Sequence, residues 1–131
     1  MTPHERRFQA DGSRLRDPER LALMEVPRVV RLTMQGVAAA SVLDVGTGTG
    51  VWAEAFAAEG LSVSGIDPNP GLLAAAREAV PSATFVAGTA ERLPFADGSF
   101  DIVFLGHVLH EADDRMAALR EARRVAAKRV A

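Results

Sequence analysis

The sequence predicts an α/β protein with a doubly wound parallel sheet. Short apolar runs alternate with helical segments, the first run leads directly into three alternating glycines, and an acid ends the second run. Alternating strands and helices are typical of a parallel sheet with helices on its faces. Right-handed crossovers then make the sheet doubly wound.

Each expected strand is a short apolar run of the kind that is buried in a parallel sheet. The strands are expected over residues 42–45, 61–66, 83–87 and 100–105, in the spatial order 3-2-1-4. The helices between and after them are expected over residues 51–59, 71–80 and 113–127.

A further helix is expected before the sheet. Asp17 suits an N-cap and Pro18 the first helical position. Pro27 should kink or split this helix, and Gly36 should end it. We therefore divide the chain into an N-terminal helical segment, residues 1–36, and a sheet-containing domain, residues 37–131.

Composition excludes several classes of function. The chain has no cysteine, so disulfides, thiolate metal sites and a cysteine nucleophile are ruled out. A net charge of −2 gives no field that attracts nucleic acid or an anionic membrane. No apolar run approaches the ~20 residues of a membrane span, and residues 1–7 do not form a signal peptide. We expect a cytoplasmic protein with no nucleic-acid or membrane partner.

The most informative stretch is the loop that follows the first strand, Asp44-Val45-Gly46-Thr47-Gly48-Thr49-Gly50. Glycines let the backbone turn sharply and let a ligand approach closely. The helix that follows offers free N–H groups at its start. In open parallel sheets ligands bind beyond the carboxyl ends of the strands, where strand order reverses, so a ligand site is expected here.

Asp67 stands 21 residues after Gly46, at the end of the second strand. A carboxylate at that place can accept two hydrogen bonds from a ribose diol. The glycines alone are a weak signal. Together with the strand, the helix and this acid they predict a nucleoside site.

Phosphate-bearing nucleosides fit the loop poorly. A nicotinamide dinucleotide fingerprint would put its third glycine at Val51, whereas this chain has it at Gly50. A P-loop needs a Gly-Lys-Ser/Thr ending, which is absent. The loop therefore favours a cofactor without phosphates.

The chain resembles class I S-adenosylmethionine-dependent methyltransferases, which have a Rossmann-like fold, over about residues 41–127. The matching motifs are residues 43–50, 65–69, 88–95, 97–103 and 118–125. The resemblance looks closest to the small-molecule branch that includes quinone-biosynthesis methyltransferases. It implies S-adenosyl-L-methionine as cofactor, methyl transfer as activity and a small molecule as methyl acceptor.

The resemblance also implies roles for individual residues. The methionine moiety would lie beside Asp44, Gly46, Thr47, Gly48 and Gly50. The ribose would be held by Asp67, with Pro68 and Asn69 beside the adenine. The adenine edge would be flanked by Thr89 and Ala90, and the floor near the sulfonium would be lined by Leu105 and His107. Relatives usually carry Asp where this chain has Thr89. A threonine hydroxyl can bind the adenine amino group only as an acceptor, so this contact should be weaker.

His107 and His110 are the weak candidates for a general base, because they follow the fourth strand and histidine titrates near neutral pH. In the simpler interpretation His107 shapes the cofactor floor and His110 caps a helix or faces solvent. A metal site at His107, His110 and Glu111 is not expected, since this order matches no usual zinc signature.

The sequence indicates an incomplete domain, truncated after the fourth strand and its helix. Lys128–Ala131 would be the first residues of a fifth strand, and a full class I domain would add about three strands. The fourth strand would then be an exposed apolar edge, which we expect to pair two chains into a homodimer.

Three functions remain open from the sequence. The first is methyl transfer to a small molecule. The second is a cofactor-binding or interaction module without turnover, because C-terminal strands are missing. The third is a nicotinamide-dependent oxidoreductase, which Val51 opposes.

Overall fold

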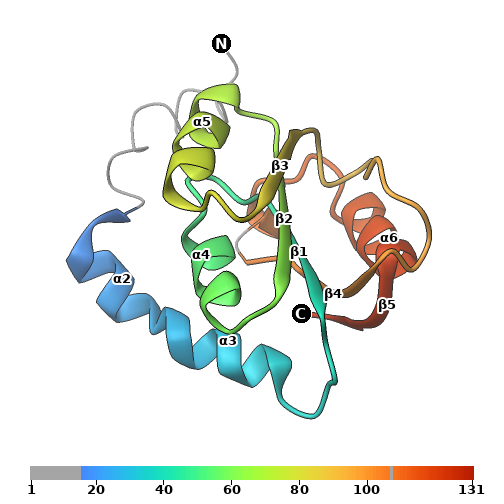
Figure 1. Ribbon diagram of the computed structural model, residues 1–131. Helices are drawn as coiled ribbons and strands as arrows, with labels where there is room; N and C mark the ends of the chain where they lie inside the picture. Colours follow the sequence, from blue (N-terminus) through green and yellow to red (C-terminus); the bar gives the residue numbers. More distant parts are fainter. Residues whose placement is uncertain (1–15, 107) are drawn as a thin grey trace.

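The structure is a computed structural model that describes residues 16–106 and 108–131. Five strands form one parallel sheet in the order β3-β2-β1-β4-β5 (Figure 1). They are β1 (Ser41–Val45), β2 (Ser62–Asp67), β3 (Thr84–Ala87), β4 (Phe100–Phe104) and β5 (Ala126–Val130). The chain runs outward from β1 to β3 and then returns to the other side of β1. The predicted doubly wound sheet is therefore confirmed.

Helices cover both faces of the sheet (Figure 1). The helices are α2 (Pro18–Met24), α3 (Val26–Met34), α4 (Val51–Ala58), α5 (Pro70–Ala79) and α6 (Arg115–Val125), with a short 3-10 turn η2 (Val108–His110). The first four lie on one side, and α6 lies on the other. No helix in the described ranges is long and apolar enough to cross a membrane.

The two faces of the sheet form two hydrophobic cores, because successive side chains of a strand point to opposite faces. Val42 and Ile102 pack toward α4 with Phe56. Leu43 and Val103 pack toward α6. The four strand side chains are buried on both faces of the sheet, which explains why these strands are continuous apolar runs in the sequence.

The helix expected before the sheet is split in two, as Pro27 predicts. Asp17 caps α2 by accepting from the Glu19 amide at 2.8 Å. The break falls at Glu25, which adopts a left-handed conformation (φ 49°), and Pro27 then lies in the first turn of α3. Proline is tolerated there because its missing N–H is not needed by the helix. Val30 of α3 is fully buried in the same core as α4.

The expected limit of the sheet, after the fourth strand and its helix, is wrong because a fifth strand follows. The last helix ends at Val125, and residues 126–130 form β5 rather than a helical end followed by a strand fragment. Alanine favours helix in isolation, but pairing with β4 outweighs this preference at Ala126, which lies opposite Phe100. The Leu105 amide also donates to the Ala131 carbonyl at 2.7 Å.

The exposed edge predicted at β4 is also wrong. β4 lies between β1 and β5, so its backbone groups are paired on both sides. The homodimer expected through a bare fourth-strand edge loses its physical basis. The edges of the sheet are β3 and β5, and β5 carries Lys128 and Arg129, charges of the kind that discourage edge pairing.

Two charged side chains of β5 also hold it to the end of α3 and to the segment before β1. The Arg129 guanidinium donates to the carbonyls of Thr33 and Gln35 at the end of α3, at 2.8 and 2.7 Å. Lys128 donates to the Ala38 carbonyl at 2.6 Å. A cation at the C-terminal end of a helix is favourable, because the helix dipole is negative there.

Replacement of Arg129 by alanine tests this attachment of β5. Arg129→Ala should lower the free energy of unfolding by about 1–2 kcal/mol, since two hydrogen bonds from a charged donor are lost. Urea unfolding measures the change. Arg123→Ala, at an exposed position of α6, is the control and should change little; equal stability of the two variants would contradict the attachment.

Candidate functional site

The candidate site lies at the carboxyl edge of the sheet, where β1, β2 and β3 end side by side. The parallel register places Val45 opposite Ile66 and Asp67 opposite Ala87. The Gly88 amide donates to the Asp67 carbonyl at 3.2 Å. The loops that follow these three strands are therefore direct neighbours.

The glycine loop after β1 makes a turn that requires glycine. Gly46, Gly48 and Gly50 all have positive φ, at 71°, 55° and 84°. The amides of Gly46 and Thr47 both donate to the Ile66 carbonyl, at 2.9 and 3.0 Å. The loop is thus bound to the end of β2, and α4 begins directly after it.

Asp67 joins the loops after β1 and β2. Its side chain is buried, and its two oxygens accept from the amides of Gly48 at 3.0 Å and Asn69 at 2.9 Å. Hydrogen bonds from backbone amides stabilise the ionised form of a carboxylate. These two bonds place the Asp67 carboxylate between the glycine loop and the turn after β2.

Asn69 and Pro68 continue the turn after β2. The Asn69 side chain accepts from the amides of Gly71 and Leu72 at 2.9 and 3.2 Å and so caps α5. Pro68 is exposed beside it. The sequence grouped both with Asp67, and the structure brings all three together.

Asp44 is the second buried carboxyl group at this edge. Only 1% of it is exposed, and Thr47 Oγ1 donates to its Oδ2 at 2.8 Å. Burial raises the pKa of Asp44 to about 7, against the opposing effect of the Thr47 bond, and the neighbouring charge of Asp67 adds to the rise. Oδ1 has no hydrogen-bond partner among the described residues.

A buried acceptor without a partner is costly in a folded protein. Asp44 Oδ1 and Thr49 Oγ1 both have this property within the described part of the chain, and both belong to the glycine loop region. A ligand with hydrogen-bond donors, such as an ammonium group, would satisfy the Asp44 oxygen. The loop therefore has the chemistry of a site for a polar, cationic ligand.

The loop after β3 carries Thr89 and Ala90. Thr89 is exposed, whereas Ala90 is buried in the core on the α6 side. Thr89 also forms an isolated antiparallel bridge with Arg92, which makes a tight turn. Because Gly88 is bonded to Asp67, this turn begins next to the loop after β2.

The residues predicted after β4 are only partly brought together. Leu105 is buried at the end of β4. His110 is exposed and ends η2. His107 lies outside the described residues. Within the described ranges no group of His, Asp or Glu has the arrangement of a metal site.

One contact of the glycine loop could not be expected from the sequence. The Arg16 guanidinium donates to the Thr49 carbonyl and to the Glu54 carboxylate, each at 2.7 Å. It links the N-terminal segment to the loop and to α4. No motif marks this arginine, since its partners lie 33 and 38 residues further along the chain.

Comparison with known proteins agrees with this geometry. Residues 43–129 match the family described as "Methyltransferase domain", which is more than half of the chain. The chain therefore belongs to the methyltransferase domain family. Its matched region contains the glycine loop, both buried carboxyl groups and α6.

Individual relatives support the same assignment. The chain is 38% identical over 108 residues to a demethylmenaquinone methyltransferase of Renibacterium salmoninarum, a match that covers 80% of this chain and 46% of the relative. It is similar to the solved YcgJ protein of Bacillus subtilis (31% identity, TM-score 0.72, 79% and 46% of the two chains). A SAM-dependent methyltransferase from Aquifex aeolicus is also similar (27% identity, TM-score 0.76, 89% and 66%). The chain spans about half the length of the curated relatives it matches.

The raised pKa of Asp44 predicts a pH-dependent stability without any ligand. Between about pH 4 and 7 the folded protein keeps a proton that the unfolded chain has lost, so the free energy of unfolding falls as pH rises. The largest slope from one such group is about 1.4 kcal/mol per pH unit.

Asp44→Asn should remove this component, because the amide does not ionise and still accepts from Thr47. Urea unfolding at several pH values from 5 to 8 measures it. The free energy of unfolding of the variant minus that of the parent should rise from pH 5 to about pH 7 and then level off toward pH 8. A difference that is constant with pH would contradict the shifted pKa.

Proposed function

We propose that this chain binds S-adenosyl-L-methionine at the carboxyl edge of its sheet and takes part in methyl transfer to a small-molecule acceptor. The observation that carries the proposal is the pair of buried carboxyl groups, Asp44 and Asp67, on either side of a glycine turn. This pair offers one acceptor for a cationic amine and one for a diol. Membership of the methyltransferase domain family supports the same ligand.

In the proposed site the glycine loop accommodates the methionine part of the cofactor. The turn packs closely on the protein at Gly46, where a Cβ would meet Val108 at 2.9 Å, and Thr47 orients Asp44. Asp44 Oδ1 is the acceptor proposed for the ammonium group, which would provide the hydrogen bond that this buried oxygen lacks in the described structure.

The nucleoside part is assigned to the loops after β2 and β3. Asp67 is proposed to accept from the ribose hydroxyls, with Pro68 and Asn69 beside the adenine. Thr89 and Ala90 are proposed to flank the adenine edge, and the bond from Gly88 to Asp67 supports this grouping because it holds the two loops together. Leu105 and His107 complete the proposed set at the end of β4.

The chemistry asks little covalent work of the protein. S-adenosyl-L-methionine supplies an electrophilic methyl group when it is bound. The chain's own residues bind and orient, and a fixed in-line arrangement provides most of the rate gain in such a displacement. His107 and His110 remain candidates for the general base that would accept a proton from a protonated methyl acceptor.

The acceptor is proposed to be a small molecule of the quinone-biosynthesis type. Support comes from the named relatives, among them demethylmenaquinone methyltransferases. Binding without turnover is the alternative outcome. Transfer of a labelled methyl group to demethylmenaquinone tests the proposal, and cofactor binding without any transfer would support the alternative.

The ribose contact gives a direct test of the cofactor site. Asp67→Ala should weaken the binding of S-adenosylhomocysteine by roughly 1.5–3 kcal/mol, since a charged acceptor of two hydrogen bonds is lost. Isothermal titration calorimetry measures it. Glu78→Ala, at an exposed position of α5, is the control with the same type of substitution.

Because Asp67 also holds the amides of Gly48 and Asn69, the stability of Asp67→Ala is measured in parallel. Gly48→Val adds a second test, since a side chain should block the ligand sterically at this position; its stability is also measured, because the φ of 55° there favours glycine. If the parent, Asp67→Ala and Gly48→Val bind the ligand alike, the proposed site is wrong.

The ammonium contact predicts a pH-dependent affinity. A neutral Asp44 attracts a cation less than an ionised one, and burial raises the pKa of Asp44 to about 7. Binding of S-adenosylhomocysteine should therefore strengthen from pH 6 to pH 8, with release of a proton. Calorimetry in buffers of different ionisation enthalpy detects this proton, and Asp44→Asn should abolish both effects. Equal proton release by parent and variant would argue against Asp44 as the acceptor.

A further inference from the structure

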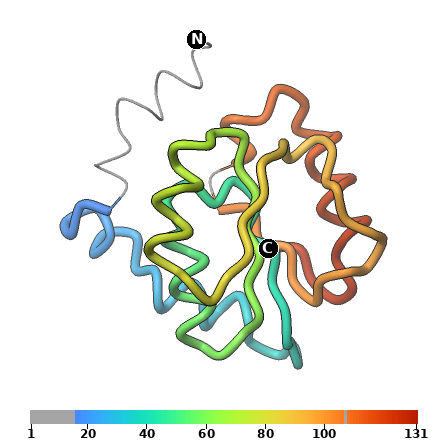
Figure 2. The backbone as a smooth tube through the Cα atoms, turned by 45° about the horizontal axis from the view of Figure 1, so that its top comes forward, coloured from blue at the N-terminus to red at the C-terminus, as the bar shows by residue number. Residues whose placement is uncertain are grey.

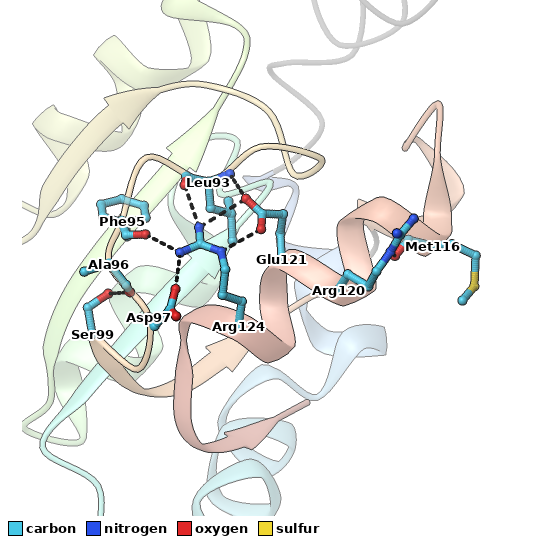
Figure 3. Close-up of polar contacts among 9 residues, drawn as sticks. All are labelled: Leu93, Phe95, Ala96, Asp97, Ser99, Met116, Arg120, Glu121 and Arg124. Carbon is cyan, nitrogen blue, oxygen red and sulfur yellow. Dashed lines mark hydrogen bonds and ion pairs between the residues drawn. The ribbon is translucent and has the colours of Figure 1, made fainter.

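The loop between β3 and β4, residues 88–99, is fastened along α6. In Figure 2 this segment passes to the side of the sheet on which α6 lies. Its attachment depends on two side chains of α6, Glu121 and Arg124, drawn in Figure 3.

All three guanidinium nitrogens of Arg124 donate hydrogen bonds in this attachment. Its Nη1 donates to the Phe95 carbonyl and to Asp97, both at 2.8 Å. Its Nη2 donates to the Leu93 carbonyl at 3.0 Å, and its Nη2 and Nε donate to Glu121 at 3.1 and 2.7 Å. The planar fork thus holds three residues of the loop and one of its own helix at once.

Glu121 and the backbone complete the attachment. Glu121 Oε1 accepts from the Leu93 amide at 2.8 Å, so Leu93 is held through both its amide and its carbonyl. The Gly98 amide donates to the Arg124 carbonyl at 2.9 Å. The hydrogen bond from Arg124 lowers the pKa of Glu121, which favours the ionised pair.

The held segment leads directly to the turn of Thr89 and Ala90. Leu93 is buried, as is Ala90, and both belong to the core on the α6 side. On the other side of this turn, Gly88 is bonded to Asp67. Glu91 accepts from the Asp113 amide at 3.0 Å, just before α6. The position of the turn is therefore set by β2 at one end and by α6 at the other.

We propose that Glu121 and Arg124 are positioning residues for the adenine end of the ligand site: by fixing Leu93, Phe95 and Asp97 on α6, they set where Thr89 and Ala90 stand. Neither side chain contacts the ligand in this proposal. They act through the loop. The inference rests on the proposed function, because it assigns the turn at Thr89 to adenine.

The test compares two ligands that differ only in the base. S-adenosylhomocysteine carries an amino group at position 6, and S-inosylhomocysteine carries an oxo group there. The parent protein should prefer the adenine ligand. Arg124→Gln should weaken S-adenosylhomocysteine binding about tenfold or more and S-inosylhomocysteine less than threefold, so that the preference is reduced.

Arg120→Gln is the matched control. Arg120 lies one turn earlier on the same helix, is exposed and bonds the Met116 carbonyl within that helix (Figure 3). Its replacement should leave the preference unchanged. Arg124→Lys keeps the charge but not the planar fork, so it should fail to restore the preference.

A purely structural role of Arg124 predicts a different result. It would lower the unfolding midpoint and weaken both ligands by the same factor, and that outcome would overturn the inference. A base preference in Arg124→Lys equal to that of the parent would also overturn the inference. If Arg124→Gln does not fold, the base preference of Arg124→Lys decides between the two roles. Failure of the parent to bind either ligand would instead overturn the proposed function and the inference together.

Hydrogen exchange of the ligand-free protein provides a second readout. The amides of Leu93 and Gly98 should exchange at least tenfold faster in Arg124→Gln than in the parent, while the Val103 amide in β4 should not change. Unchanged exchange at Leu93 and Gly98 would show that Arg124 does not hold the loop, whatever the ligand.

Discussion

The site depends on a single buried carboxylate that binds two turns together. Asp67 accepts from the amides of Gly48 and Asn69, so the turn after β1 and the turn after β2 are held in one arrangement. Without this acceptor two buried amides would lose their partner, which is expensive away from water. The glycines permit the turn, but the carboxylate determines where it lies.

Asp44 gives the same edge of the sheet its chemical character. It is buried a few residues before the turn that Asp67 holds, and burial together with the neighbouring charge of Asp67 raises the pKa of Asp44. A ligand that brings a positive charge would oppose this rise at Asp44.

The sequence predicted the strand ends that carry the proposed site residues better than the limits of the sheet. The glycine loop, Asp44 and Asp67 are local signals, since each stands at the end of a strand that its own apolar pattern reveals. β5 is different: its residues, among them Ala126 and Ala127, have helical propensity, and only the partner strand β4 makes them extended. The expected bare edge of β4 failed for the same reason.

Contacts between distant parts of the chain could not be predicted from the sequence. Arg16 reaches the carbonyl of Thr49, and Arg124 reaches the carbonyls of Leu93 and Phe95. A backbone carbonyl has no identity in the sequence, so the partner of such an arginine cannot be read from residue types. In the sequence, Arg124 is one of two adjacent arginines near the end of the helix expected over residues 113–127, and nothing there points to the loop beside it.

We propose above all that a nucleoside ligand lies across the carboxyl ends of β1 and β2. The structure of the complex with S-adenosylhomocysteine tests it most directly. We expect the ribose to lie against Asp67 and the amino acid part to lie beside Asp44 and the glycine loop. A ligand bound instead in the groove formed by Arg28, Arg31, Leu32, Met34, Gln35 and Glu59, where α3 and α4 end, would contradict it.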